Sequence, residues 1–346
     1  MKDYVRIANA IDMKNFKQSV KNIEMLQDNL LYPEKLLFPM TLQFELTRNC
    51  NLRCKHCYNA SGVRSFSDPM TPEEWIKLSN YIVSKGGIFE CILSGGEPLL
   101  IGESIFDIMD ILHEDGTSFL LITNGMLLTE NMVRKFKKYN FMWLQVSIDG
   151  YDAETHDEFR GIKGSWDRAT NGAYYVSKHG IPLTIAHSVT PKSLKDIDKM
   201  CELAYQLGAG TIILGEITPS GRSISNKDIL LSYEERNELL KKTEEQRVKY
   251  AGRMVVERSA NTKIQLMRYQ KTLNTGAIIR PNGDIRLDCM TPFKIGNVLI
   301  DDLYDVWNEK SNVCWNDDRV SKYIEHMDLQ TGYSDIKNYV DEDILI

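Results

Sequence analysis

The sequence predicts an α/β fold with a small α+β appendage at its C-terminal end. Between Thr41 and Ile217, six short β-rich runs alternate with amphipathic helical patterns, which is typical of a parallel sheet with crossover helices. After Ile217 the pattern changes to a long charged helix and then to two β runs joined by a tight turn. Six such units form either a partial barrel or an open doubly wound sheet, and both bind ligands at the carboxyl ends of the strands.

Each predicted strand is a short apolar run followed by polar or glycine-rich residues. The strands are Thr41–Leu46, Phe89–Ser94, Ser118–Thr123, Phe141–Ser147, Pro182–Thr190 and Thr211–Ile217. The segments at their ends are a cysteine-rich loop, Gly95 to Pro98, Thr123 to Gly125, Ser147 to Gly150, His187 to Thr190, and Gly215 with Glu216. We therefore expect these segments to gather on one rim of the sheet.

Three parts are expected along the chain. They are a helical extension at residues 1–40, a barrel at residues 41–255 and the appendage at residues 256–346. The run SYEERNELLKKTEEQRVKYAG predicts a helix with a solvated charged face. Asn282 and Gly283 join two β runs and predict a hairpin, and a further helix is expected through LYDVWNE.

Composition limits the classes of function. A formal net charge of -6 over 346 residues argues against a mainly electrostatic grip on nucleic acid or on an anionic membrane. The N-terminal residues lack the continuous apolar core of a secretory signal, and no run is long and apolar enough to span a bilayer. Seven cysteines fit reduced thiols better than a disulfide framework, so we expect a cytoplasmic protein.

Three of these cysteines, Cys50, Cys54 and Cys57, lie in one loop after the first predicted strand. A thioredoxin-like redox pair would use only two of them. A structural zinc site would need a fourth ligand, and His56, between two of the cysteines, would reach the same metal only with strain. The other cysteines stand singly at Cys91, Cys201, Cys289 and Cys314. A four-iron cluster explains all three thiols and leaves one iron open.

The cysteine spacing, the aromatic Tyr58 directly after Cys57 and the position after the first strand resemble the radical SAM enzymes. This resemblance implies a partial (βα)6 barrel and a [4Fe-4S] cluster on Cys50, Cys54 and Cys57. In that family the open iron chelates S-adenosylmethionine, and one electron cleaves it to a 5′-deoxyadenosyl radical that abstracts hydrogen from a substrate. An external one-electron reductant such as flavodoxin or ferredoxin is also implied.

The run Gly95-Gly96-Glu97-Pro98 resembles the family's GGE motif, in which backbone and carboxylate groups receive the amino group of S-adenosylmethionine. The alternative is a tight turn from strand to helix. The turn after the third predicted strand, with glycine again at its end, falls at the same rim.

The region from Ser147 to Arg168 resembles the SPASM and twitch subgroup of this family. By that resemblance Ser147 and Arg160 contact the ribose and carboxylate of S-adenosylmethionine, and Arg168 is the substitute for Arg160. The alternative for Arg160 is a surface ion pair with Asp157 or Glu158.

Two residues on later strands are less specific signals. His187 lies in a predicted strand and either lines the cofactor or substrate pocket or is a hydrogen-bonded core histidine. Glu216, near the end of the sixth strand, is either a substrate base or a rim carboxylate.

The segment from Ile279 to Trp307 resembles the start of a SPASM or twitch domain, which carries auxiliary iron–sulfur clusters. The cysteine expected after Gly296 and Asn297 is absent, and only Cys289 and Cys314 remain. Two thiolates cannot supply a four-cysteine cluster, so we expect a degenerate appendage that favours redox-neutral outcomes over net oxidation. Cys289 is then either a thiyl hydrogen donor or an inert buried thiol.

The resemblance favours a ribosomally made peptide as the substrate of post-translational modification. A carbohydrate or other small metabolite in natural-product biosynthesis is the alternative. Two other classes remain open: a non-catalytic iron–sulfur electron-transfer or sensing protein, and a zinc-stabilised binding module. Neither nucleic acid nor membrane is expected as a partner.

Overall fold

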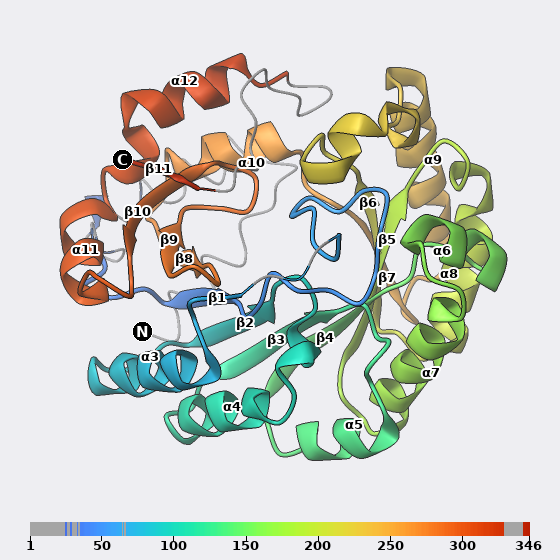
Figure 1. Cartoon of the computed structure of the whole chain (residues 1–346). Helices are drawn as coiled ribbons and strands as arrows, with labels where there is room; N and C mark the ends of the chain where they lie inside the picture. The colour runs from blue at the N-terminus through green and yellow to red at the C-terminus, as the bar shows by residue number, and fades with distance from the viewer. Residues whose placement is uncertain are drawn as a thin grey trace.

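The computed structural model describes residues 25, 28, 29, 33, 35–63, 65, 67–328 and 342–346. Most of the expected helical extension at residues 1–40 therefore lies outside the described residues. One sheet of 11 strands runs through the described chain in the order β11-β10-β9-β8-β1-β2-β3-β4-β5-β6-β7. The strands curve around a central space, with helices along their outer side (Figure 1).

The six predicted strands are all present, and neighbours in the chain are parallel neighbours in the sheet. They are β1 (Thr41–Glu45), β2 (Glu90–Ser94), β3 (Ser118–Thr123), β4 (Phe141–Ser147), β5 (Leu183–Val189) and β6 (Thr211–Glu216). The partial α/β barrel expected from the sequence is therefore confirmed.

A seventh strand, β7 (Val255–Arg258), was not predicted from the sequence, and it pairs in parallel with β6. Its four residues carry a weak pattern, with Val256 buried and Val255 half exposed at the edge of the sheet. The expected boundary between residues 255 and 256 falls inside this strand. The barrel unit therefore extends at least to Arg258.

Helices pack their apolar faces against the outer side of the strands. They are α3 (Pro72–Ser84), α4 (Ser104–Glu114), α5 (Glu130–Phe136), α6 (Ala153–Arg160), α7 (Ser165–Lys178) and α8 (Ile197–Gln206). On β1, Leu42 and Phe44 are buried, and the Phe44 ring lies 4.9 Å from the Trp75 ring of α3. Since side chains alternate along a strand, Gln43 and Glu45 face the interior of the barrel. Among the described residues, no helix combines the length and apolar character needed to cross a membrane.

The appendage continues the barrel sheet. Strand β8 (Gly276–Ile279) pairs in parallel with β1, and β9 (Asp284–Arg286) returns antiparallel to β8. The predicted hairpin is confirmed, with Gly283 in the left-handed region at φ 88°. The remaining elements are α9 (Tyr233–Lys249), α10 (Thr262–Tyr269), β10 (Phe293–Asn297), α11 (Leu303–Lys310), α12 (Asp318–His326) and β11 (Ile344–Leu345). Trp307 of α11 is fully buried.

Candidate functional site

The three clustered cysteines lie in the loop that follows β1, at the carboxyl end of the sheet. All three are free thiols; Cys54 is buried, and Cys50 and Cys57 are partly exposed. Backbone hydrogen bonds join this loop to the end of α6, from Arg53 N to Arg160 O at 3.0 Å and from Lys55 N to Phe159 O at 3.0 Å. The loop is therefore fixed to the region that follows β4.

The glycine-rich segment after β2 lies directly against the cysteine loop. The amide of Gly96 donates to Thr47 O at 2.6 Å, and the amide of Glu97 donates to Asn49 O at 2.8 Å. A Cβ atom at Gly96 would lie 2.2 Å from Asn49 O, so a side chain there would force the two backbones apart. Glycine is needed here because the two segments share backbone hydrogen bonds.

Glu97 is fully buried and joins the end of β2 to the end of β3. Its carboxylate accepts hydrogen bonds from the Thr123 hydroxyl at 2.7 Å, Asn124 N at 2.9 Å and Leu99 N at 3.2 Å. Burial raises the pKa of Glu97 to about 7, although these hydrogen bonds favour the ionised form. The segment thus forms a tight turn, the alternative noted from the sequence, and it does so at the expected rim.

Asn124, directly after β3, contacts the cysteine loop with its side chain. Its amide donates to Asn51 Oδ1 at 2.7 Å and lies 3.8 Å from Cys50 Sγ. The sequence placed this turn at the rim but gave Asn124 no role. The structure shows an amide donor beside a sulfur atom.

Arg160 is buried beside the cysteine loop at the end of α6. Its Nε lies 2.6 Å from Asp149 Oδ2, and its NH1 lies 3.6 Å from Cys54 Sγ. The surface ion pair considered from the sequence is wrong, because Glu158 binds Lys55 and Lys192 instead. The other proposed partner carboxylate, Asp157, accepts hydrogen bonds from Gly164 N, the Ser165 hydroxyl and Trp166 N. The substitute, Arg168, lies exposed on α7.

Asp149 is the centre of a buried polar cluster after β4. Besides Arg160, His56 Nε2 and His187 Nδ1 each lie 3.9 Å from its carboxylate, and its amide donates to His156 Nδ1 at 3.1 Å. Burial opposes ionisation, but Arg160 and the histidines hold the pKa of Asp149 down at about 2. Burial lowers the pKa of His56 and of His156 to about 4, so both rings are neutral at pH 7.

Two histidines singled out from the sequence, His56 and His187, belong to this cluster. His56 points to Asp149 and stacks on the Phe159 ring at 4.7 Å. His187 is buried within the cluster, with Nδ1 3.3 Å from Ile148 O. It is thus a hydrogen-bonded core histidine, while Ser147 lies partly exposed at the end of β4.

Arg222, in the segment after β6, holds the other side of the cysteine loop. Its amide donates to Cys57 O at 3.0 Å, and its guanidinium donates to Cys54 O at 2.7 Å and Ser61 O at 2.6 Å. No sequence motif marked this residue. Glu216 on β6 pairs with Arg236 and Arg258, as a rim carboxylate does.

Tyr58 points away from the loop toward β1. Its hydroxyl donates to Glu45 Oε1 at 2.9 Å, and burial raises its pKa well above the usual value. Asn59 Nδ2 donates to the same oxygen at 3.3 Å. One carboxylate of β1 thus holds the end of the cysteine loop.

The cysteine loop has the donor set that an iron–sulfur cluster requires. Within the described residues, no group of three or more His, Cys, Asp or Glu side chains is gathered tightly enough for a single metal ion. In an iron–sulfur cluster each thiolate binds a different iron, so the sulfur atoms lie further apart than the ligands of a single metal ion. Burial raises the pKa of Cys50 to about 12 and also raises that of Cys54, whereas the adjacent Arg160 lowers the latter. Bound cations would displace these protons, and the Arg160 and Asn124 donors already face the sulfur atoms.

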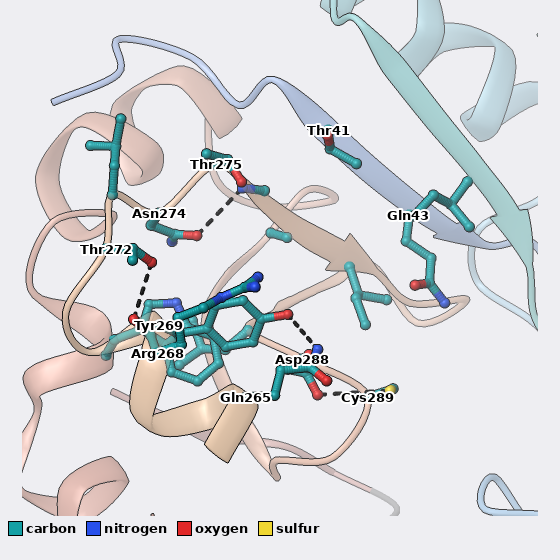
Figure 2. A pocket seen from close by; sticks show the side chains of 17 residues that line it. Thr41, Gln43, Gln265, Arg268, Tyr269, Thr272, Asn274, Thr275, Asp288 and Cys289 are labelled. Carbon is teal, nitrogen blue, oxygen red and sulfur yellow. Dashed lines mark hydrogen bonds between the residues drawn. The ribbon is translucent and has the colours of Figure 1, made fainter. Parts of the chain in front are cut away.

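A cavity of about 380 Å³ opens between the interior face of β1 and the appendage. Figure 2 shows Thr41 and Gln43 of β1 across this cavity from Tyr269 of α10. Asp288 and Cys289 complete one wall, and Cys289 Sγ lies 3.7 Å from Asp288 Oδ1. Its volume falls within the range of small-molecule sites.

The two appendage thiols differ in exposure and in hydrogen-bond partners. Cys314 is buried and accepts a hydrogen bond from Asn274 Nδ2 at 3.6 Å. Cys289 is partly exposed, and burial of its thiol raises its pKa well above the usual value. The two sulfur atoms therefore have different surroundings: Cys289 lines the cavity beside β1, and Cys314 lies against Asn274.

Residues 44–204 match the family model of the radical SAM superfamily. The chain is 36% identical over 191 residues to an AdoMet-dependent heme synthase of Methanosarcina barkeri, covering 55% of this chain and 54% of that protein. It is 27% identical over 281 residues to the antilisterial bacteriocin subtilosin biosynthesis protein AlbA of Bacillus subtilis, covering 78% of this chain and 60% of AlbA.

Streptococcus suis SuiB has a similar fold. Its crystal structure with S-adenosylmethionine aligns with a TM-score of 0.67 and 15% identity, over 92% of this chain and 80% of SuiB. SuiB has also been solved with its precursor peptide SuiA, and that structure aligns with a TM-score of 0.64. The chain spans between 54% and 60% of the length of the two curated relatives.

Proposed function

Because residues 44–204 of this chain form a radical SAM domain, we propose that the chain is a radical SAM enzyme that modifies a ribosomally made peptide. The superfamily uses a [4Fe-4S] cluster and S-adenosylmethionine, and the bound pair supplies a 5′-deoxyadenosyl radical that abstracts hydrogen from the substrate. Product identity then depends on which hydrogen the protein holds near the radical.

The observation that carries this proposal is the cysteine loop. Cys50, Cys54 and Cys57 are free thiols in one loop, and segments from the ends of β2, β3, β4 and β6 hold it. The thiolates of these residues bind the cluster, and the Arg160 guanidinium stabilises their negative charge. Neither a redox-active cysteine pair nor an electron carrier requires a cysteine loop that segments from the ends of four strands hold in place.

We assign the binding of S-adenosylmethionine to the same rim. The backbone of Gly95, Gly96 and Pro98 seats the methionine end. Three donors already occupy the Glu97 carboxylate, so Glu97 acts by holding this turn in place. Arg160 and Ser147 face the carboxylate and ribose. His187 and Tyr58 act from behind as buried supports of the pocket wall.

The cavity beside β1 is the proposed place for the reacting part of the substrate. It lies on the interior face of β1, the strand whose end carries the cysteine loop. Gln43, which lines the cavity, is two residues before Glu45 at the end of that strand. About 380 Å³ holds one amino-acid side chain of a longer peptide. Cys289 lines this cavity, so its thiol is placed to return a hydrogen atom to a substrate radical. The thiyl radical left on Cys289 would then take up one electron from the external reductant and a proton from water to restore the thiol.

A peptide substrate is supported by AlbA, which is named for the biosynthesis of a bacteriocin, and by SuiB, which was solved with the precursor peptide SuiA. The 36% identity to a protein named as an AdoMet-dependent heme synthase favours a second candidate, a small metabolite. In both cases a reduced flavodoxin or ferredoxin supplies the electron.

The test is anaerobic reconstitution followed by measurement of iron, sulfide and 5′-deoxyadenosine after addition of dithionite and S-adenosylmethionine. We expect about four irons per chain and steady formation of 5′-deoxyadenosine. Iron without 5′-deoxyadenosine would favour an electron-transfer or sensing protein. Zinc without iron would favour a structural binding module.

The substrate class is tested by isotope transfer. Peptides and candidate metabolites uniformly labelled with deuterium are added, and mass spectrometry of 5′-deoxyadenosine reports which class donates a deuterium. Transfer from a peptide supports the first candidate, and transfer only from a metabolite supports the second.

A further inference from the structure

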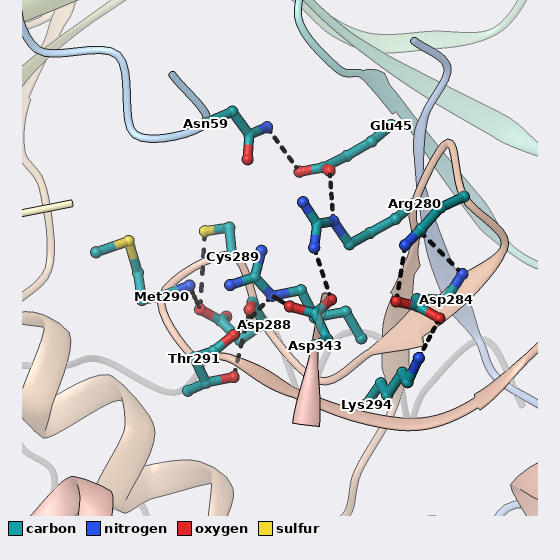
Figure 3. Close-up of polar contacts among 12 residues, drawn as sticks. Glu45, Asn59, Arg280, Asp284, Asp288, Cys289, Met290, Thr291, Lys294 and Asp343 are labelled. Atoms are coloured by element: carbon teal, nitrogen blue, oxygen red, sulfur yellow. Dashed lines mark hydrogen bonds and ion pairs between the residues drawn. The ribbon is translucent and has the colours of Figure 1, made fainter. Parts of the chain in front are cut away.

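A row of buried charged side chains connects residues 342–346, here called the C-terminal segment, with the cysteine loop. Figure 3 shows Glu45, Arg280 and Asp343 in contact. Arg286 contacts the other oxygen of the Asp343 carboxylate. These four side chains alternate in sign, and none of the residues is more than 4% exposed. They come from β1, from the β8–β9 hairpin and from the residue that precedes β11.

The contacts divide each carboxylate between two neighbours. Arg280 NH1 donates to Asp343 Oδ2 at 2.8 Å, and Arg280 Nε lies 3.6 Å from Glu45 Oε2. Arg286 Nε lies 3.6 Å from Asp343 Oδ1 and donates to Thr291 O at 2.6 Å. Within this row two carboxylates balance two guanidiniums, in a buried region where an unbalanced charge is costly. The Asp288 carboxyl also lies near Arg286.

The other oxygen of Glu45 belongs to the cysteine loop. Glu45 Oε1 accepts hydrogen bonds from the Tyr58 hydroxyl at 2.9 Å and from Asn59 Nδ2 at 3.3 Å. Tyr58 directly follows Cys57 in the chain. Glu45 therefore divides its two oxygens between Arg280 and the end of the cysteine loop.

The C-terminal segment contributes to this arrangement mainly through one carboxylate. Ile344 and Leu345 are 41% and 54% exposed, so they bury little apolar surface. The backbone is held by hydrogen bonds from Ile344 N to Pro292 O at 2.8 Å and from Ile346 N to Lys294 O at 3.0 Å. Asp343 is the buried side chain of this segment, at 4% exposure.

We propose that Asp343 is a positioning residue for the cysteine loop, acting through Arg280 and Glu45 on Tyr58. While Asp343 engages Arg280, Glu45 keeps one oxygen for Tyr58 and Asn59. Without the Asp343 charge, Arg280 engages both oxygens of Glu45 as a fork, and the Tyr58 hydroxyl loses its acceptor. The segment next to Cys57 then loosens. The importance of this for catalysis rests on the proposed role of Cys57 as a cluster ligand.

The experiment measures the cysteine loop in the metal-free protein, so it does not depend on the cluster. The rate of alkylation by iodoacetamide is followed at Cys57 by mass spectrometry, with the fully buried Cys201 as an internal monitor of global opening. For Asp343→Asn we expect alkylation of Cys57 to be about tenfold faster, with Cys201 unchanged. The matched control is Arg319→Met, which removes the hydrogen bond from Arg319 to Leu345 O at 2.8 Å but keeps the carboxylate; here we expect less than about a twofold change.

A double-mutant cycle separates positioning from general stabilisation. Tyr58→Phe should by itself accelerate alkylation of Cys57, and adding Asp343→Asn should then change the rate by less than about twofold. Independent, multiplying effects would overturn the proposal, as would unchanged Cys57 or equal acceleration at Cys57 and Cys201.

A charge-balanced variant covers the case in which Asp343→Asn does not fold. Asp343→Asn combined with Arg286→Met removes one carboxylate and one guanidinium together, so the net charge of the four-residue row is the same as in wild type. It should show the same acceleration at Cys57, and a wild-type rate would overturn the proposal. If the wild-type chain binds no iron, the proposed function fails, and the alkylation result still decides the role of Asp343.

Discussion

Two regions of this protein hold thiols beside buried arginine–carboxylate pairs, and they differ in what the thiols do. At the cysteine loop, Arg160 binds Asp149 at 2.6 Å and also lies 3.6 Å from Cys54 Sγ. In the appendage, Arg280 binds Asp343 at 2.8 Å, and its Nε lies 3.6 Å from the Glu45 carboxylate of β1. The first pair contacts a thiol of the proposed cluster site, and the second stabilises a packed interface. A buried ion pair alone therefore does not identify a cofactor site.

The two regions also differ in how many segments of the chain surround their thiols. Segments after β2, β3, β4 and β6 all contact the cysteine loop, whereas Cys289 and Cys314 stand singly in the appendage, where Cys289 donates to Asp288 Oδ1 and Cys314 accepts from Asn274 Nδ2. Three thiols in one braced loop suit a multi-iron cofactor. Two separated thiols do not.

The largest expected effect separates these regions directly. Cys57→Ala should reduce iron after reconstitution from about four per chain to background and abolish 5′-deoxyadenosine, because a thiolate ligand is lost. The double variant Cys289→Ala with Cys314→Ala should keep the full iron content. Iron, sulfide and 5′-deoxyadenosine are measured on both, and iron loss in the appendage variant would reveal a second cluster.

The next effect concerns the buried pair at the cysteine loop. Arg160→Met leaves Asp149 buried without its main counter-charge and should lower the free energy of unfolding of the metal-free protein by about 3–5 kcal/mol. The exposed pair of Lys192 with Glu158 is the control, since Lys192→Met should cost less than about 1 kcal/mol. Urea unfolding measures both, and equal losses would contradict the distinction between buried and exposed pairs.

A third effect compares the two buried carboxylates of the rim by their pH dependence. Arg160 and histidines keep the pKa of Asp149 at about 2. Glu97 accepts hydrogen bonds from uncharged donors, and burial outweighs both these bonds and the Arg160 charge, so its pKa rises from 4.5 to about 7. The folded state therefore binds the Glu97 proton more tightly, so its stabilising contribution is full below pH 4.5 and is lost as pH rises through about 7.

Removal of the ionisable group tests this assignment. The loss between pH 4.5 and pH 8 should amount to about 2–3 kcal/mol in wild type and be absent in Glu97→Gln, which keeps the shape but not the titration. Urea unfolding of the metal-free proteins over this range gives the difference between the two curves. Parallel curves would show that Glu97 ionises normally.

The smallest effect concerns the close approach of the glycine-rich turn. Gly96→Ala places a Cβ atom 2.2 Å from Asn49 O and should destabilise the protein by about 1–3 kcal/mol. Gly210→Ala is the control, because its nearest neighbour, Leu183 O, lies 3.9 Å away. Thermal unfolding ranks the two variants, and equal midpoints would mean that the turn can move away from the cysteine loop.

Local sequence patterns were sufficient to predict the barrel strands and the segments that gather at their carboxyl ends. The limits of β3 and β4 agree with those predicted, because alternating or continuous apolar runs bounded by turn residues are local signals. The cysteine loop and the glycine-rich turn were found from short-range spacing, and the hairpin from Asn282 and Gly283. The short edge strand β7 was missed because four residues carry too little pattern.

The pairing of the charged groups could not be predicted from local sequence patterns and became visible in the folded structure. Arg222 contacts a carbonyl 168 residues away, and Arg280 binds an aspartate 63 residues further along the chain. Arg160 lies near Asp157 and Glu158 in sequence, yet it binds Asp149 inside the barrel. A buried charge takes the partner that packing brings beside it without water, and packing depends on segments that are distant in the chain.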